Sequence, residues 1–456
     1  MSNTIARTPS SQLSLKSACC DAMFFSLPLI GFRVVATITS FIGMLMIATL
    51  GHRELAASAL VTPIQITLNV TGWSVIFAVA IVVGHVFGQG KIADLGKVLR
   101  QGWLIGAVLT IPLMIIFWEI GPLLRLFGQD ETLVQLVQPF FRVLAFGVLP
   151  GMFHMNFIQF ITGIGKPKII LYFSMLSIVS VLAIGYPLLF GKFGFPRLGM
   201  QGIAYSNVVS MWLACIVSFI YLLINPRYKQ FKIFQLAFND IHYLKQILKI
   251  GIPMSVQFVT ELLAFSFSAI MVGWINQASL AASQIINQIN MIMIMASFSV
   301  AQTASVLIGQ AQGRGDKHAS KIYGSATFLV GLGFAIIIAI LYYLLPKRFI
   351  GLFSVDITNP TNAATVHIAI TLFYIIAVAQ IFDSVRNIVT GALRGLKDSM
   401  MPMWIGIGAA WIIGIPGGYF LGIKLHGGAP AISFAFLIAW LLATPPLVWR
   451  FYHKVR

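Results

Sequence analysis

The chain alternates long apolar stretches with short polar segments from one end to the other. The apolar stretches reach or exceed about 20 residues, the length that crosses a bilayer as an α-helix, whereas a membrane β-barrel would need short segments of alternating polarity. We therefore predict an all-α polytopic membrane protein. Its twelve predicted spans are residues 23–49, 57–83, 101–120, 134–161, 169–190, 200–225, 246–275, 279–309, 322–345, 362–393, 400–422 and 428–449.

The hydrophobic pattern occurs twice along the chain. Pro253 lies 225 residues after Pro28, and the same shift places Leu55-Ala56-Ala57-Ser58 on Leu280-Ala281-Ala282-Ser283. Six spans in each copy return the chain to the side on which it started, so both copies share one orientation. Such a parallel repeat predicts a transporter with its substrate path between the halves. The shift also pairs three glycines of each copy, namely Gly84, Gly88 and Gly90 with Gly309, Gly313 and Gly315.

The repeat divides the chain into an N-terminal six-helix lobe, residues 1–225, and a C-terminal six-helix lobe, residues 246–456. The segment between them, residues 226–245, is basic and partly amphipathic, and we expect it to lie at the cytoplasmic membrane surface. The paired glycines end apolar spans, with no strand before them and no Gly-Lys-Ser/Thr after them. They therefore predict close helix packing followed by a chain reversal, not phosphate-binding loops.

The composition supports a membrane protein and argues against a nucleic-acid partner. Apolar residues make up 58% of the chain and charged residues 9%, compared with roughly 25% charged residues in soluble domains. Of the 30 Lys and Arg, 20 lie on the side of the N-terminus and 7 on the other side, and the rest lie inside spans. The positive-inside rule then predicts a multi-pass protein of the plasma membrane, or of the inner membrane in a bacterium, with both termini in the cytoplasm.

Ionisable residues inside predicted spans are costly to bury and are therefore the first candidates for function. The two acids, Glu261 and Asp383, belong to the second copy of the repeat, where their first-copy counterparts are Ala36 and Gly151. This asymmetry predicts that the ion chemistry is confined to the C-terminal lobe. The basic candidates inside spans are Arg33, Arg142 and His154 in the first copy and Arg386 in the second.

Glu261 lies eight residues after Pro253, about two helical turns into its span. Removal from water disfavours a charged carboxylate, so this side chain could hold a proton, whereas a bound cation would favour the ionised form. Both behaviours suit an ion-coupled carrier. The alternative is a static salt bridge from Glu261 to Arg33 or Arg142.

Asp383 and Arg386 are three residues apart and share one helix face. Asp383 beside Glu261 would supply oxygen ligands for Na⁺, or a proton relay, so we predict that the two acids bind the coupling ion. The alternative is an intrahelical ion pair that allows Arg386 to lie in the membrane.

A run of amides followed by methionines opens the eighth predicted span. The amides of Gln284, Asn287 and Gln288 could line a wet cavity or cap helix contacts. Methionines such as Met291 adapt to varied apolar ligands, although plain packing is the alternative reading of these residues. We expect these four side chains, with Arg386, to line the cavity or the ion site.

The sequence lacks the motifs of an enzyme. No metalloprotease motif, nucleotide loop or nucleophile elbow occurs, and without a P-loop lysine the chain has no ATP drive of its own. A membrane lipid-modifying transferase is the alternative from another class, but it would need an acid–base cluster near one interface. We therefore expect no cofactor, a coupling ion that is Na⁺ or H⁺, and a monomer that contacts membrane lipid and small organic substrates.

The order and spacing of several segments resemble the multidrug and toxic compound extrusion (MATE) family over nearly the whole chain. The resemblance implies a V-shaped pair of six-helix bundles with a central cleft, and antiport in which Na⁺ or H⁺ enters as an organic, often cationic, drug leaves. The second-half pattern is similar to the NorM branch, which implies that its two acids are the ion-coupling residues. The segments that carry the resemblance are Pro28, Leu55-Ala56-Ala57, the glycine groups at Gly84 and Gly309, Gly251 through Glu261, Gln380 through Gly395, and Pro402.

The first half departs from the family pattern. Where members of this family commonly have an Asp on the first span, this chain has Gly43, and an Asn/Asp pair of the fifth span falls on Leu182 and Tyr186. The basic residues of this half make it less suited to binding cations. They keep open a second function in the same superfamily, a flippase for a lipid-linked anionic sugar drawn by Arg386 and the arginines of the first half.

Overall fold

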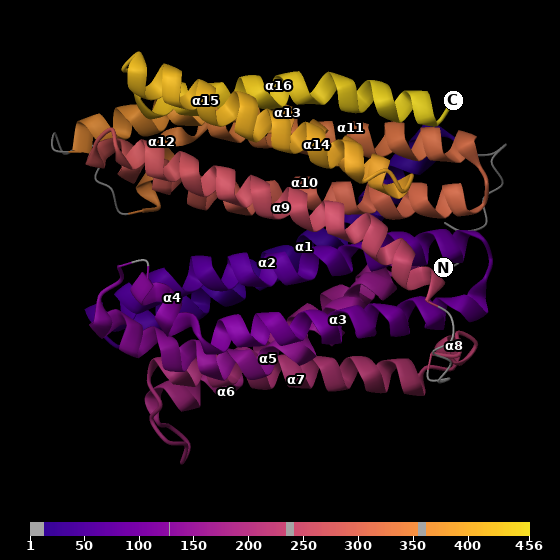
Figure 1. The fold of residues 1–456 in the computed structure, drawn as a ribbon, viewed down its shortest axis with the longest axis horizontal. Helices are drawn as coiled ribbons and strands as arrows, with labels where there is room; N and C mark the ends of the chain where they lie inside the picture. Colours follow the sequence, from indigo (N-terminus) through magenta and orange to yellow (C-terminus); the bar gives the residue numbers. More distant parts are fainter. Residues whose placement is uncertain (1–12, 127, 234–240, 354–361) are drawn as a thin grey trace. The chain divides into compact units, whose positions relative to one another are not determined.

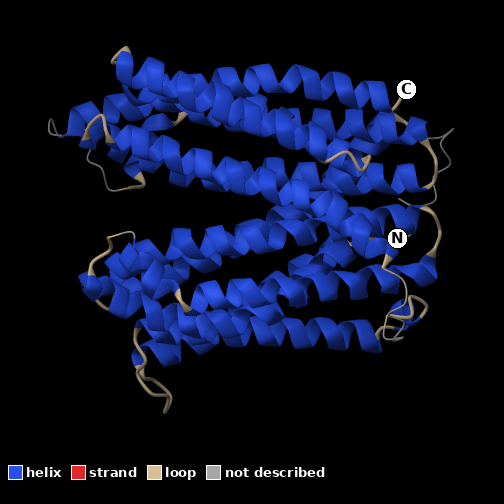
Figure 2. Ribbon diagram, in the orientation of Figure 1, coloured by secondary structure: helices blue, strands red, loops and turns tan. Residues whose placement is uncertain are grey.

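The computed structural model describes residues 13–126, 128–233, 241–353 and 362–456, and all regular elements in these ranges are helical (Figure 2). Twelve spans in them are long and apolar enough to cross a membrane, which confirms the predicted number. Eleven are single helices: α1 (Leu15–Ala48), α2 (His52–Gly88), α3 (Leu95–Trp118), α5 (Glu131–Gly163), α6 (Pro167–Phe190), α7 (Met200–Ile224), α9 (His242–Gly273), α10 (Gln277–Gly313), α11 (Lys317–Leu344), α13 (Ala363–Gly395) and α16 (Gly428–Lys454).

The remaining span, Met400–Lys424, is irregular. It consists of α14 (Met400–Gly408), the π-helical segment η4 (Ala409–Gly414), α15 (Ile415–Gly418) and a second π-helical segment, η5 (Tyr419–Lys424). Pro416 lies in the first turn of α15 and has no N–H to donate, and glycines lie on both sides of it. π-helical turns are wider than α-helical turns and are rare in proteins. Where they do occur, they are often near functional sites. Short helices complete the fold: η2 (Ile92–Asp94), α4 (Ile120–Leu126), α8 (Pro226–Lys229) and α12 (Pro346–Gly351).

The helices form two compact units. The N-terminal unit comprises Gly31–Ser255, and the C-terminal unit comprises Val256–Arg456 together with the segment that ends at Ile30. Both boundaries fall inside long helices, α1 and α9, and they lie 225 residues apart, so the internal repeat also relates the two boundaries. The division into lobes 1–225 and 246–456 with a linker at 226–245 stays a prediction; residues 234–240 of that linker lie outside the described residues.

Each unit is built around one central helix (Figure 1). In the N-terminal unit α5 packs against α2, α3 and α7, and in the C-terminal unit α13 packs against α10, α11 and α16. Close approach depends on matched glycines: a Cβ at Gly163 would lie 2.7 Å from the carbonyl oxygen of Ala80, and a Cβ at Gly395 would lie 2.8 Å from that of Ser305. The same helix–helix contact is therefore made twice, as the repeat predicts.

The glycine-rich span ends reverse the chain as predicted. Gly90 and Gly315 follow α2 and α10 with φ of 71° and 74°, in the left-handed region that glycine adopts without steric cost. The next amide in each copy bonds back to the last helical turn, from Lys91 to Val86 at 3.2 Å and from Asp316 to Ala311 at 3.1 Å. Such bonds satisfy carbonyl groups at a helix end and stop the helix.

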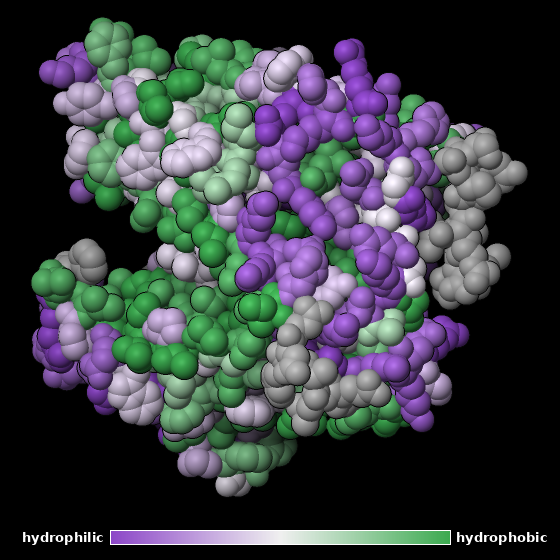
Figure 3. Space-filling view, turned by 45° about the vertical axis from the view of Figure 1, so that its right-hand side comes forward, coloured by the Kyte–Doolittle hydropathy of each residue, from purple (hydrophilic) through white to green (hydrophobic). Residues whose placement is uncertain are grey.

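Hydrophilic and hydrophobic side chains separate on the surface. Figure 3 turns the right-hand side of Figure 1 forward and shows hydrophilic side chains, in purple, gathered on that side, where the chain ends at Arg456. Hydrophobic side chains, in green, cover the flanks of the helices away from it. This separation is that of a multi-pass membrane protein, whose apolar flanks face lipid.

Candidate functional site

The two predicted coupling acids meet in the core of the C-terminal unit. Glu261 lies on the part of α9 that belongs to this unit, and Asp383 lies on its central helix, α13. Their exposed fractions are 7% and 6%, and Arg386, one turn after Asp383, is 2% exposed. Ionised groups buried this deeply need partners, because desolvation of an unpaired charge is very costly.

Arg386 supplies that partner for both acids. Its Nη1 lies 2.7 Å from Oε1 of Glu261, and its Nη2 lies 2.9 Å from Oδ1 of Asp383. Two further bonds, Nη2 to Oε2 of Glu261 at 3.4 Å and Nε to Oδ1 of Asp383 at 3.2 Å, make the guanidinium a bridge between α9 and α13. The intrahelical pair expected from the three-residue spacing is confirmed.

The predicted alternative partners of Glu261 are wrong. Glu261 pairs with Arg386, 125 positions along the chain, and not with Arg142 or Arg33. Arg142 is exposed on α5, where its guanidinium carbon lies 5.5 Å from the ring centroid of Trp118. Arg33 and Arg142 both belong to the N-terminal unit, whereas α13 carries a cation into the same unit as Glu261. The reach of the Arg386 side chain from α13 to α9 therefore decides the pairing.

Neutral donors complete the hydrogen bonding of the carboxylates. Gln257, one turn before Glu261, donates to Oε1 of Glu261 at 2.9 Å, and Asn387 donates to Oδ2 of Asp383 at 3.1 Å. Every oxygen of the two carboxylates thus accepts at least one bond from an N–H group. On its other face, Arg386 stacks on Trp440 of α16, with its guanidinium carbon 4.2 Å from the ring centroid. The ring provides a cation–π contact that strengthens when water is excluded.

A second buried arginine extends this network, and the sequence analysis did not predict its role. Arg394 is 8% exposed and donates through Nη2 to Oε1 of Gln257 at 2.8 Å. Its guanidinium carbon lies 5.1 Å from the ring centroid of Phe258. Two acids and two arginines give the network a formal charge of zero. The eight-residue spacing from Arg386, which places both on one face of α13, was the available signal.

The predicted amide stripe forms one exposed face of α10. Gln284, Asn287, Gln288 and Met291 are all exposed and recur at helical spacing, whereas Ile285 between them is buried. Amides at membrane depth avoid lipid and face protein or a water-filled cavity. The stripe is therefore suited to line a wet path. It is separate from the bridge made by Arg386.

The basic candidates of the N-terminal unit have neighbours of their own. Nδ1 of His154 lies 2.9 Å from Oγ of Ser218, and its ring lies beside those of Phe157 and Phe173. Arg33 is partly buried on α1. Arg33, Arg142 and His154 therefore lie in three separate environments on α1 and α5.

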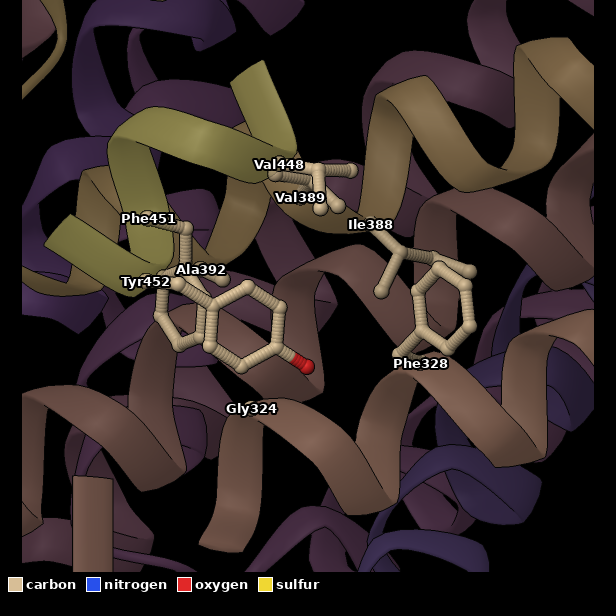
Figure 4. A pocket seen from close by; sticks show the side chains of 8 residues that line it. All are labelled: Gly324, Phe328, Ile388, Val389, Ala392, Val448, Phe451 and Tyr452. Carbon is tan, nitrogen blue, oxygen red and sulfur yellow. The ribbon is translucent and has the colours of Figure 1, made fainter. Parts of the chain in front are cut away.

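The cavity in Figure 4 does not belong to this site. It lies among α11, α13 and α16, has a volume of about 10 Å³ and is lined mainly by apolar side chains such as Phe328, Ile388 and Phe451. A drug-sized ligand needs roughly 300 Å³ or more, so this cavity is a packing gap. Among the described residues no group of three or more His, Cys, Asp or Glu is placed to hold a metal ion.

Similarity to known proteins agrees with this architecture. The MatE family model matches residues 28–187 and 253–420, two segments that begin 225 residues apart. The chain is 29% identical over 439 residues to the probable multidrug resistance protein NorM of Rhizobium meliloti, covering 95% of this chain and 93% of that protein. It is 28% identical over 437 residues to the probable multidrug resistance protein NorM of a Synechocystis species, covering 93% and 92%.

Solved structures share the fold. An outward-facing multidrug resistance MATE family transporter of the MOP superfamily is similar with a TM-score of 0.87 and 16% identity, covering 100% of this chain and 98% of that one. A MOP superfamily transporter from Pyrococcus furiosus has a TM-score of 0.86 and 15% identity, with coverage of 100% and 98%. The family model covers well over half of the sequence, and the chain therefore belongs to the MatE family, whose members are membrane transporters and not enzymes.

Proposed function

We propose that this transporter exports small organic molecules, preferentially cations, in exchange for H⁺ or Na⁺, and that Glu261 and Asp383 bind the coupling ion. Similarity to proteins named for multidrug resistance supports the substrate class. The burial of both acids in one copy of the repeat supports the coupling role, since ionisable groups at membrane depth mark ion pathways. The basic segments support an inner-membrane location with both termini in the cytoplasm.

The observation that carries the proposal is the bridge from α9 through one guanidinium to α13. Two carboxylates compete for Arg386, so neutralising either one leaves the arginine bound to the other alone. The electrostatic link between the helices then weakens, and the balance between two helix arrangements shifts. A ligand biases such an equilibrium by its different affinity for the two states.

The exposed face of α10 is proposed as part of the substrate path. Its amides would orient polar groups of a substrate, and Met291, which is 47% exposed, would adapt to varied apolar surfaces. Breadth of recognition follows from flexible side chains, because they repack around ligands of different shape.

Transport by the purified protein in liposomes tests the coupling role. Under an imposed ion gradient, Glu261→Gln and Asp383→Asn are each expected to reduce drug efflux at least tenfold. Glu131→Gln is the matched control, because Glu131 also pairs with an arginine but is half exposed at the start of α5. Undiminished gradient-driven efflux in both core variants would exclude the proposal.

The flippase for a lipid-linked anionic sugar stays the second candidate, and the exposed guanidinium of Arg142 favours it. Arg386 no longer supports it, since two carboxylates already neutralise this arginine. An assay of lipid-linked sugar movement in proteoliposomes with Arg142→Ala separates the two functions. Sugar movement that depends on Arg142, without drug efflux, would replace the proposed function.

A further inference from the structure

We propose that Arg386 makes the coupling site select protons over sodium ions, because its guanidinium already occupies the position between Glu261 and Asp383 where a metal cation would bind. The inference rests on the coupling role proposed above for the two acids. It goes further by naming the ion and the residue that decides between the two ions.

Every oxygen of the two carboxylates already accepts a bond from an N–H donor, so a metal ion would have to share or displace these bonds. Arg386 reaches Oε1 and Oε2 of Glu261 at 2.7 and 3.4 Å and Oδ1 of Asp383 at 2.9 Å. Gln257 donates a second bond to Oε1 of Glu261 at 2.9 Å, and Asn387 donates to Oδ2 of Asp383 at 3.1 Å. A hard cation requires several oxygen ligands at once. The donor set around these acids therefore does not fit sodium while Arg386 is in place.

Arg386 is also poorly placed to move aside. Its side chain is 2% exposed and lies between the two acids and the ring of Trp440, 4.2 Å from the centroid. A sodium ion that displaced it would leave a buried guanidinium with no counter-charge, and breaking one side of a buried ion pair is strongly unfavourable.

The charges around Glu261 further disfavour a metal ion as a second cation beside Arg386. From α13 it faces Asp383, Arg386 and, through Gln257, Arg394; from α9 itself it has only the amide of Gln257. On the remaining sides are the backbone of α14 at Gly406, where a Cβ would lie 2.9 Å from Oε1, and the uncharged Trp440 of α16. A sodium ion would add a full charge to a network that is already neutral.

A proton also adds one positive charge, but it needs no set of oxygen ligands. It needs one lone pair on one carboxylate, and Arg386 then stays paired with the other acid. Oδ2 of Asp383 faces only the amide of Asn387, whose carbonyl oxygen can turn to accept from a protonated acid. The site therefore accepts a proton with a small local rearrangement, whereas sodium would require the arginine to leave.

The test imposes sodium and pH gradients separately on proteoliposomes that contain the full chain. Wild-type efflux is expected to follow the pH gradient and to change less than twofold with a sodium gradient at equal pH. Arg386→Gln, which empties the cation position and keeps a polar side chain, is expected to gain at least fivefold stimulation by sodium. Arg386→Lys keeps a cation there and is expected to stay insensitive to sodium. Arg125→Gln, which removes an arginine from an exposed pair with Glu131, is the control for loss of an arginine away from the site.

A binding measurement keeps the test informative if Arg386→Gln does not transport. Thermal unfolding in detergent is compared in sodium chloride and choline chloride at one ionic strength, and only Arg386→Gln is expected to unfold at a higher temperature in sodium. Sodium-driven efflux by the wild-type protein would overturn the inference, as would an Arg386→Gln variant indifferent to sodium in both assays. Wild-type efflux that follows neither gradient would instead defeat the coupling proposal, while the unfolding assay would still decide whether Arg386 excludes sodium.

Discussion

The two central helices, α5 and α13, share their packing but not their chemistry. Both approach a neighbouring helix at a glycine, Gly163 on α5 and Gly395 on α13. A Cβ placed on either glycine would lie at almost the same distance from the facing carbonyl oxygen. Twelve residues earlier, however, α13 carries Asp383 where α5 carries Gly151. The comparison teaches that small residues preserve the scaffold in both copies, while Asp383 and Arg386, which distinguish the second copy, lie two or more helical turns before this contact.

The histidine that corresponds to Arg386 shows how far the copies differ. His154 stands 232 residues before Arg386 and bonds to the hydroxyl of Ser218, among aromatic rings. That pairing can be satisfied by a neutral imidazole. Arg386, in contrast, is charged at any physiological pH and requires the carboxylates around it.

The largest expected effect comes from removing each of these basic residues. Arg386→Met leaves Glu261 and Asp383 buried without their cation and is expected to cost about 3–5 kcal/mol of stability. His154→Leu removes one hydrogen bond and is expected to cost about 1 kcal/mol. Thermal and denaturant unfolding of the purified variants in detergent measures both.

A neutral variant of the whole cluster serves as the control. Combining Arg386→Met with Glu261→Gln and Asp383→Asn removes every charge of the bridge and is expected to recover most of the lost stability, because the two carboxylates no longer lie buried without their cation, while Arg394 keeps its bond to Gln257. If the triple variant is no more stable than Arg386→Met alone, the loss comes from packing and the electrostatic contrast between the two helices fails.

The next prediction compares how much the matched glycine contacts of α5 and α13 contribute to stability. Gly163→Ala and Gly395→Ala each place a methyl group against a carbonyl oxygen that cannot move as a side chain can, at 2.7 and 2.8 Å. Each is expected to cost about 1–3 kcal/mol, and the two losses should agree to within about 1 kcal/mol. Clearly unequal losses in the unfolding assay would show that the copies pack differently despite their matched glycines.

These contacts also show what the sequence could and could not predict. The twelve spans follow from apolar length, and the chain reversals at Gly90 and Gly315 follow from glycine placement, both of which are local properties. The Asp383–Arg386 pair is also local, since three-residue spacing places both side chains on one face. The bond from Arg386 to Glu261 joins residues 125 positions apart and depends on where α9 and α13 lie in the folded unit, which periodicity does not reveal.

The missed features have similar causes. Arg394 directly follows the predicted span 362–393, and its eight-residue spacing from Arg386 was the only signal of its burial. Its bond to Gln257 joins two helices far apart in the sequence, which spacing alone does not predict. The π-helical turns of the Met400–Lys424 span depend on hydrogen-bond geometry that apolar length does not encode. The amides of α10 were recognisable by spacing, but only the structure shows that they form one exposed face.

A smaller effect distinguishes the loops that follow α5 and α13. Burial alone would raise the pKa of Asp398, but hydrogen bonds from Arg450 and Lys454, at 2.6 and 2.8 Å, hold this pKa below its ordinary value. A carboxylate with a lowered pKa stabilises the fold fully above its unfolded pKa of about 3.9, and this contribution is lost as the pH falls through the folded value. The corresponding residue after α5 is Lys166, which has no such acid-linked contribution.

Asp398→Asn is therefore expected to cost about 1 kcal/mol at neutral pH, a value kept small because both basic partners are partly exposed. The difference from wild type should shrink as the pH approaches 3. Unfolding temperatures measured in detergent between pH 7 and pH 3 check this trend. A difference that stays constant over that range would mean that the carboxylate charge contributes nothing.

The smallest effect concerns the backbone of the same loops. Lys397 has φ of 61°, in the left-handed region, and its counterpart after α5 is Gly165, with φ of 81°. A side chain in this region costs about 1 kcal/mol relative to glycine, since its Cβ crowds the following carbonyl. Lys397→Gly is therefore expected to raise stability by up to about 1 kcal/mol, and Gly165→Ala to lower it by a similar amount, as measured by unfolding in detergent. The same backbone bond closes both turns, from Asp398 to Leu393 at 2.9 Å and from Lys166 to Ile161 at 3.1 Å. Stability changes of opposite sign in the two variants would therefore show that one turn geometry governs both copies. Changes of equal sign would mean that side-chain contacts outweigh this geometry.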